Sequence, residues 1–226
     1  VSNVTTQFEK LGYVANNLSN MNTKGYKSVT FEQMLNEDGY LTGAIRTETR
    51  QGSIQVTSNP YDVAIDGTGY IPVVSPEGEV AYTRDGAFKQ GKDGYLVTTD
   101  DWIVGEGIKI PANCYKFEIK PNGEVYSYDA ANTKPKKLGT IPLVRFASQE
   151  NLEQRGMNKL VATADSGDPM LVRNHNCFCQ NNIENSNTNI YSSTSDMLRL
   201  NASLLASTSM MKVVEDMYNK AINIRE

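Results

Sequence analysis

The sequence is poor in residue types that define several common classes of protein. It has three cysteines, one histidine and one tryptophan in 226 residues. The cysteines (Cys114, Cys177 and Cys179) are too few and too unevenly spaced for a disulfide framework. The 22 basic and 26 acidic residues give a net charge of -4 with no basic stripe. This balance argues against a nucleic-acid partner and gives no electrostatic reason to bind an anionic membrane.

Long hydrophobic runs are also absent. No apolar run approaches the ~20 residues of a membrane-spanning helix, and no charged-then-apolar signal segment opens the sequence. We therefore expect no membrane insertion, and we expect any export to use a route without a cleaved signal peptide. The 39% hydrophobic fraction is sufficient for the core of one sizeable domain or two small ones.

Patterns that carry catalysis or metal binding are weak. His175, Cys177 and Cys179 resemble metal ligands, but a site needs about four donors, and alternating side chains on a strand explain this spacing better. The histidine has no G-x-S-x-G nucleophile near it. Four aspartates lack the spacing of a calcium loop, and Asp-Gly is ordinary turn chemistry: Asp62, Asp66, Asp85 and Asp93. We expect no enzyme activity, no cofactor and no metal.

Arg84, in the stretch Tyr-Thr-Arg-Asp-Gly, admits two interpretations. The arginine can anchor a hairpin turn through stacking and a charge-assisted bond to Asp85, which is a structural role. It can equally contact a neighbouring subunit. The sequence alone does not separate these two roles.

Each end of the chain has the periodicity of an amphipathic helix. Apolar residues recur at alternating steps of four and three, which is the seam of a helix that can enter a coiled coil. Gly25 is expected to end the first helix as its C-cap. One helix cannot bury such a seam alone, so the ends must pair with each other, with the β domain or with other copies. The seams are Val4, Phe8, Leu11, Ala15 and Leu18, and Met197, Leu200, Leu204, Met211, Val214 and Tyr218.

Between the helices, short β-branched and aromatic runs are separated by turn sequences, which indicates hairpins. These turns are Pro76-Glu77-Gly78, Asp85-Gly86, Asp93-Gly94 and Pro121-Asn122-Gly123. We predict an α+β fold, in which the N- and C-terminal helices pair as an α-helical coiled-coil domain and the centre is an all-β domain. The expected parts are an N-terminal helix in 1–35, a connector in 36–56, the β domain in 57–172, a return connector in 173–189 and a C-terminal helix in 190–226.

Several motifs resemble those of one known family. The segment ANNLSNMNTKGYK is similar to the signature A-N-N-L-A-N-x-x-T-x-G-[FY]-[KR] of the bacterial flagellar rod and hook proteins. The stretches QGSIQVTSNPYDVAIDGTGYIPV, AYTRDGAFKQGKDGYLVT, IPANCYKFEIKPNGEVY and IENSNTNIYSSTSDML follow in the family's order. Two segments depart from the family pattern, at 187–193 and 204–208.

The resemblance implies a structural rod subunit of the flagellar basal body, which polymerises into a helical tube that transmits torque and lines the export channel. The implied partners are copies of the chain, neighbouring rod, hook or basal-body axial proteins, surrounding ring proteins and the flagellar type III export apparatus. Chain length and the stretch WIVGEGIKIP favour the proximal over the distal rod slightly. The alternative interpretation is a secreted β-rich hydrolase or carbohydrate-binding module.

The resemblance also suggests a use for the asparagines of the signature, which are poor helix formers. In a packed helical tube their amides would bond neighbouring backbones and subunits. The expected assembly contacts are therefore the two seams together with signature residues Asn16, Asn17, Asn20, Thr23, Gly25 and Tyr26.

Overall fold

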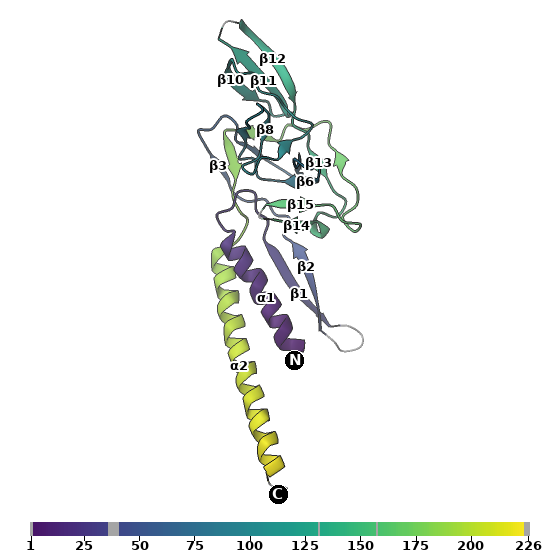
Figure 1. Ribbon diagram of the computed structural model, residues 1–226, viewed down its shortest axis with the longest axis vertical. Coiled ribbons are helices and arrows are strands. Elements are labelled where there is room, and N and C mark those ends of the chain that lie inside the picture. Colours follow the sequence, from purple (N-terminus) through teal and green to yellow (C-terminus); the bar gives the residue numbers. More distant parts are fainter. Residues whose placement is uncertain (1, 36–40, 131, 157, 224–226) are drawn as a thin grey trace. The chain divides into compact units, whose positions relative to one another are not determined.

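The structure is a computed structural model that describes residues 2–35, 41–130, 132–156 and 158–223 (Figure 1). The chain divides into two compact units. A helical unit comprises Val1–Ser19, Val29–Arg46 and Asn189–Glu226, and a β unit comprises Asn20–Ser28 and Thr47–Thr188. Each unit therefore contains segments that are far apart in sequence.

The helical unit consists of two helices and one hairpin. Helix α1 (Ser2–Ser19) and helix α2 (Ile190–Asn223) pack side by side and run antiparallel (Figure 1). Strands β1 (Val29–Leu35) and β2 (Leu41–Thr47) pair with each other, and β1 packs against α1. At 1.5 Å per residue, α2 is about 51 Å long and α1 about 27 Å. The last part of α2 therefore extends beyond α1.

The β unit contains antiparallel sheets of two, three and seven strands. The seven-stranded sheet has the order β14-β15-β6-β5-β9-β8-β7. Its strands are β5 (Ile71–Val74), β6 (Val80–Thr83), β7 (Lys89–Gln90), β8 (Leu96–Val97), β9 (Ile103–Val104), β14 (Glu153–Arg155) and β15 (Lys159–Val161). The three-stranded sheet contains β10 (Cys114–Ile119), β11 (Glu124–Asp129) and β12 (Asn132–Thr140).

Three short strand pairs complete the β unit. Strand β4 (Val63–Ile65) pairs with β17 (Phe178–Gln180), and β3 (Ile54–Val56) pairs with β18 (Asn182–Glu184). Strand β13 (Val144–Arg145) pairs with β16 (Met170–Leu171), and a 3-10 helix spans Gln149–Asn151. The pairs β3–β18 and β4–β17 attach the C-terminal return of the chain to its early strands.

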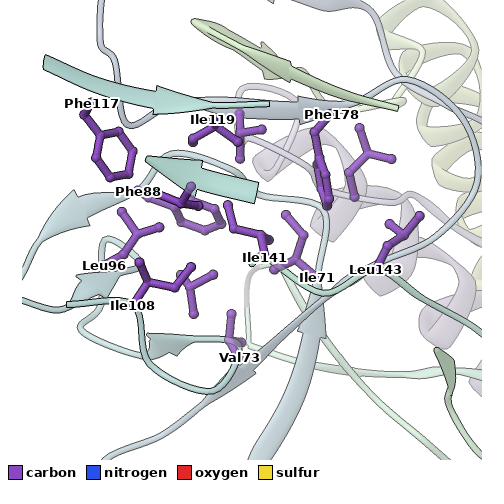
Figure 2. Close-up of a cluster of buried hydrophobic side chains, with 14 of the residues drawn as sticks. Ile71, Val73, Phe88, Leu96, Ile108, Phe117, Ile119, Ile141, Leu143 and Phe178 are labelled. Atoms are coloured by element: carbon purple, nitrogen blue, oxygen red, sulfur yellow. The ribbon is translucent and has the colours of Figure 1, made fainter. Parts of the chain in front are cut away.

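One main hydrophobic core joins the sheets of the β unit. Phe117 and Ile119 of β10 lie in the same cluster as Phe88, Leu96 and Ile108, and all five side chains are buried (Figure 2). Phe117 and Ile119 occupy alternate positions on β10, and Leu96 lies on β8, so the inward faces of more than one sheet fill one core. A second cluster consists of Tyr70, Tyr82, Val144, Phe146, Leu152 and Leu160.

The structure has the predicted arrangement of a helix at each end and a largely β centre, but the first helix is shorter than predicted. Helix α1 ends at Ser19, and Val29–Leu35, placed in the N-terminal helix by the prediction, is a strand. The side chain of Asn17 bonds both the N–H and the C=O of Val29, at 2.8 and 2.7 Å. These bonds pair the end of α1 with an extended backbone, which a continuing helix would not allow.

The predicted connectors also contain strands. Segment 36–56 includes β2 and β3, although 36–40 lie outside the described residues, and segment 173–189 includes β17 and β18. Three of the four expected turns do join paired strands, but Asp85-Gly86 does not, because β6 pairs with β5 and β15 while β7 pairs with β8. Asp85-Gly86 instead connects β6 to β7, two strands that do not pair with each other.

Candidate assembly surfaces and a buried ionic junction

Three sequence motifs meet at the buried carboxylate of Glu184, which has no exposed surface. Its Oε1 accepts hydrogen bonds from Lys27 Nζ at 2.7 Å and from the Gly52 N–H at 2.9 Å. Its Oε2 accepts a bond from Arg84 Nε at 2.6 Å. The signature segment, the Tyr-Thr-Arg-Asp-Gly stretch and the C-terminal return therefore meet in one ionic junction, formed by Lys27, Arg84 and Glu184.

The ionic junction holds two cations and one anion, and backbone carbonyls satisfy the remaining donors. Arg84 donates to the carbonyls of Gly69 at 2.8 Å and Gly67 at 2.9 Å, and Lys27 donates to that of Arg50 at 2.7 Å. Burial lowers the pKa of the Lys27 ammonium, and the neighbouring Glu184 carboxylate opposes this shift. A buried group of charges so fully hydrogen-bonded fixes the mutual position of its three segments.

Gly25 brings the signature segment into contact with the Arg84-Asp85 backbone. Its φ is +65°, and a Cβ atom would lie 2.3 Å from the Asp85 nitrogen. Its N–H donates to the backbone carbonyl of Glu184 at 2.8 Å. Glycine is required here for both conformation and space, so Gly25 serves chain packing within the β unit and is not the cap of α1.

Polar side chains of the C-terminal return bind the same segment. Asn187 accepts from the Ser28 N–H at 2.7 Å and donates to the Glu48 and Arg50 carbonyls, each at 2.9 Å. Asn185 accepts from Lys24 Nζ at 2.9 Å. The Asn187 bonds satisfy backbone groups of Ser28, Glu48 and Arg50, which lie outside the strands of the described residues.

Arg84 does not have the role expected from its sequence context. It pairs with Glu184, 100 residues away, and not with Asp85. Its side chain is 4% exposed, so it is part of the interior of the β unit and does not form a surface for a neighbouring subunit. No local pattern in the sequence indicates a partner at such a separation, so these contacts were not predicted for Lys27, Glu184, Asn185 and Asn187.

The predicted α1 seam has a mixed environment. Val4, Leu11, Ala15 and Leu18 are half-buried, whereas Phe8 is 54% exposed. Among the signature asparagines, Asn17 and Asn20 are buried and Asn16 is exposed. The Asn17 side chain binds the backbone of Val29, and the Asn20 side chain accepts from the Thr23 hydroxyl at 3.1 Å. Tyr26 is buried in the β unit.

The α2 seam divides into two parts. Met197, Leu200 and Leu204 are half-buried along the part of α2 that lies beside α1. Met211, Val214 and Tyr218, further along the helix, are exposed. The exposed apolar face of the end of α2, called the distal face below, consists of Met210, Met211, Val213, Val214, Met217, Tyr218 and Ile222.

The weak catalytic and metal candidates stay dispersed. Cys177 Sγ lies 3.6 Å from His175 Nδ1. Cys177 directly precedes β17, and Cys179 lies on this strand. Within the described residues, no group of three or more His, Cys, Asp or Glu side chains is placed to hold a metal ion. Among the described helices, none is long and apolar enough to cross a membrane.

Asp85 is buried beside the ionic junction, and burial raises its pKa from 3.8 to about 6, although the Ala87 N–H and the Asn158 amide bond its oxygens. The folded state therefore binds this proton more tightly than the unfolded state. The contribution of the Asp85 proton to the free energy of unfolding is fully present below pH 3.8 and is lost as the pH rises through about 6. This change is on the order of 3 kcal/mol.

We therefore expect Asp85→Asn to gain stability relative to the native chain between pH 4 and pH 7. Asparagine resembles the protonated aspartate in shape and does not titrate. Urea unfolding of both chains at several pH values measures the difference in their unfolding free energies. Other carboxylates titrate in both chains, so their effect cancels in this difference. A difference that stays constant over this range would contradict the buried, shifted carboxyl.

The architecture of this chain, with a helix at each end and a β centre, is the one that the resemblance to flagellar rod and hook proteins implies. The family described as Flagellar hook protein FlgE/F/G D1 domain matches residues 64–127, which lie within the β unit. The Caulobacter vibrioides flagellar basal-body rod protein FlgG is 32% identical, over 74% of this chain and 73% of its own.

Two further relatives are also FlgG proteins. FlgG of Bacillus subtilis is 33% identical over 70% of this chain and 69% of its own, and FlgG of Buchnera aphidicola subsp. Baizongia pistaciae is 27% identical over 93% and 92%. The chain belongs to the FlgG family of flagellar basal-body rod proteins. It is a structural rod subunit of the flagellar basal body, in a family of rod and hook proteins that are not enzymes.

Proposed function

We propose that this chain polymerises into a helical tube that transmits torque and surrounds the export channel, with α1 and α2 as a coiled-coil inner layer. Its partners are other copies, adjacent rod, hook and ring proteins, and the flagellar type III apparatus, which exports it without a cleaved signal peptide. We assign it to the distal rod, the position of FlgG proteins, in place of the proximal rod that chain length and the stretch WIVGEGIKIP favoured.

The distal face of α2 is the observation that supports this proposal. Its seven apolar residues cover about half of the helix circumference, and Lys212, Glu215, Asp216 and Asn219 occupy the other half. A coiled-coil seam for one partner is narrower than this. The width of the distal face therefore suits contact with more than one helix, as in a packed tube of identical subunits.

The ionic junction supports the mechanical part of the proposal. A subunit that transmits torque must not shear internally, and in the β unit the segments around residues 27, 84 and 184 are fixed by charged, fully hydrogen-bonded groups. The amides of Asn185 and Asn187 add further bonds across the same place. The β unit can thus carry load as one piece.

Hydrogen exchange tests the helical part of the proposal. In the isolated monomer we expect amides of residues 209–223 to exchange rapidly, because a helical end without tertiary packing frays. In assembled rods the same amides should exchange at least tenfold more slowly. Amides of Val73 and Val125, which are buried in the β unit, serve as the internal reference. Slow exchange of 209–223 in a verified monomer would contradict the proposal.

A further inference from the structure

Helix α1 has a second face, which is exposed and is separate from its half-buried seam. The residues of this face recur at steps of three and four, so they lie on one side of the helix. One large apolar side chain, Phe8, stands there among small or polar ones. This outer face of α1 consists of Thr5, Phe8, Gly12, Asn16 and Ser19, all of which are exposed.

Gly12 lies in the middle of the outer face of α1, and its own chain does not explain it. Among the described residues, a Cβ atom at Gly12 would meet no heavy atom within 4 Å apart from its own helix backbone. Glycine is the least favourable helix residue after proline, and inside a helix it usually has a packing or functional reason. An open hole beside an exposed phenylalanine suits a helix from another molecule.

Helix α2 also has an exposed apolar face, distinct from its seam and from the distal face. Leu198 and Leu205 are 66% and 69% exposed, and they are separated by two helical turns on one side of the helix. Ala202 lies between them, and Tyr191 continues the same side one heptad earlier. The outer face of α2 consists of Tyr191, Leu198, Ala202 and Leu205.

The two outer faces match each other in one antiparallel register. Both helices rise by about 1.5 Å per residue, so one facing pair sets all the others. With Phe8 opposite Ala202, each large side chain of either face meets a small residue of the other. The facing pairs are Phe8 with Ala202, Gly12 with Leu198, Thr5 with Leu205 and Ser19 with Tyr191.

This match is not used within one chain. The hydrogen bond from Gln7 Nε2 to Ser203 Oγ, at 3.1 Å, shows that α1 and α2 of one chain pair in the same register. The two outer faces nevertheless stay exposed, because the helices contact each other through their other sides. The complementary surface for each outer face is therefore present in a second copy of the chain.

The charges at the edges of the two outer faces are opposite in sign. Glu9 is exposed at the edge of the outer face of α1, and Arg199 is exposed at the edge of the outer face of α2. The other charges of these segments, on the far sides of the helices, are Lys10 and Asp196. Opposite charges around a contact favour its correct orientation more than they raise its affinity.

We propose that the outer face of α1 in one copy packs against the outer face of α2 in a second copy, with Phe8 on Ala202 and Leu198 over Gly12. Each large side chain enters a hole between side chains of the facing helix, as in other closely packed helices. The inference rests on the proposed function, because it names a helix contact between subunits of the tube. The contact is heterologous, since the two faces are different surfaces of one chain, and such a contact can repeat along a polymer.

Gly12→Leu in the full-length chain tests this contact, because it fills the hole that Leu198 would enter. The position is open in the single chain and leucine favours a helix, so the isolated variant should keep at least the native helix content by circular dichroism. In a strain that lacks the native protein, the variant should be exported. Its yield of rods in basal-body preparations should fall at least tenfold, because the facing helices cannot close over the added side chain.

A second substitution tests the register. Adding Leu198→Ala to Gly12→Leu exchanges the large and small members of one facing pair, and it should restore most of the rod yield. Leu205→Ala makes the same chemical change two turns further along α2, opposite Thr5, and should not restore it. Native rod yield from Gly12→Leu alone would overturn the inference. Failure of Leu198→Ala to rescue, or equal rescue by Leu205→Ala, would also overturn it.

This inference and the proposed function can fail separately. Hydrogen exchange of residues 209–223 reports on the distal face and does not depend on Gly12. If Gly12→Leu builds rods in which 209–223 exchange slowly, the contact between the outer faces is wrong and the tube proposal stands. If 209–223 exchange rapidly in native rods, the role of the distal face is wrong, whatever the result for Gly12→Leu.

Discussion

Glu184→Gln should lower the unfolding free energy of this protein by about 3–5 kcal/mol, because it leaves two buried cations without their anion. Glutamine also places an N–H group opposite the donors of Lys27 and Arg84, where the native carboxylate accepts at 2.7 and 2.6 Å. Total stabilities of about 5–15 kcal/mol make such a loss a large fraction of the whole. Urea unfolding of the full chain measures it.

Two further chains make this result specific. Glu153→Gln makes the same chemical change at an exposed position and should alter stability by less than about 0.5 kcal/mol. Adding Lys27→Met to Glu184→Gln removes one unpaired cation, so the double variant should lose less than the sum of the single losses. If Glu184→Gln unfolds at the same urea concentration as the native chain, the ionic junction does not hold the β unit together.

Leu204→Asp should abolish rod completion and swimming in a strain that lacks the native protein. Leu204 is half-buried on the part of α2 that runs beside α1. A carboxylate there enters an apolar helix contact at a cost of several kcal/mol, and the cost recurs in every subunit of the polymer. Export, rod completion and swimming are each measured, so that a failure of assembly is distinguished from a failure of export.

The control for this variant is Asn201→Asp, which adds the same charge to the same helix at an exposed position. We expect it to swim close to normally. Leu18→Asp, on the half-buried side of α1, should behave like Leu204→Asp. Normal swimming by Leu204→Asp would mean that the seam does not carry assembly.

The elements that local patterns determine were predictable. The four-three periodicity predicted a helix at each end, and Pro76-Glu77-Gly78, Asp93-Gly94 and Pro121-Asn122-Gly123 do join paired strands. The first helix was predicted too long because Asn17 diverts the chain through bonds to Val29, which no periodicity reveals. Alternation around Cys177 and Cys179 did indicate a strand, which overlaps β17, whereas β18 was missed because its partner, not its composition, defines it.

The buried centre of the β unit was not predictable from the sequence alone. The expected partner of Arg84 was the adjacent Asp85, because a sequence shows only which residues are neighbours along the chain. The structure pairs Arg84 with Glu184 instead. Glu184 occurs in a polar, asparagine-rich stretch that is typical of an exposed loop. Its complete burial depends on two cations that the fold brings to it. The assembly role of the seams remains a prediction.

The ionic junction also bears on how quickly this protein can fold. Its two ion pairs join residues separated by 157 and 100 positions, so neither can form until most of the chain is present and long loops have closed. Until then Lys27, Arg84 and Glu184 are ordinary solvated charges, and the β unit lacks its central ties. The native sequence thus delays its own folding. We expect a delay of this kind to favour the export route proposed above, because a chain that has not yet folded can pass through a narrow channel.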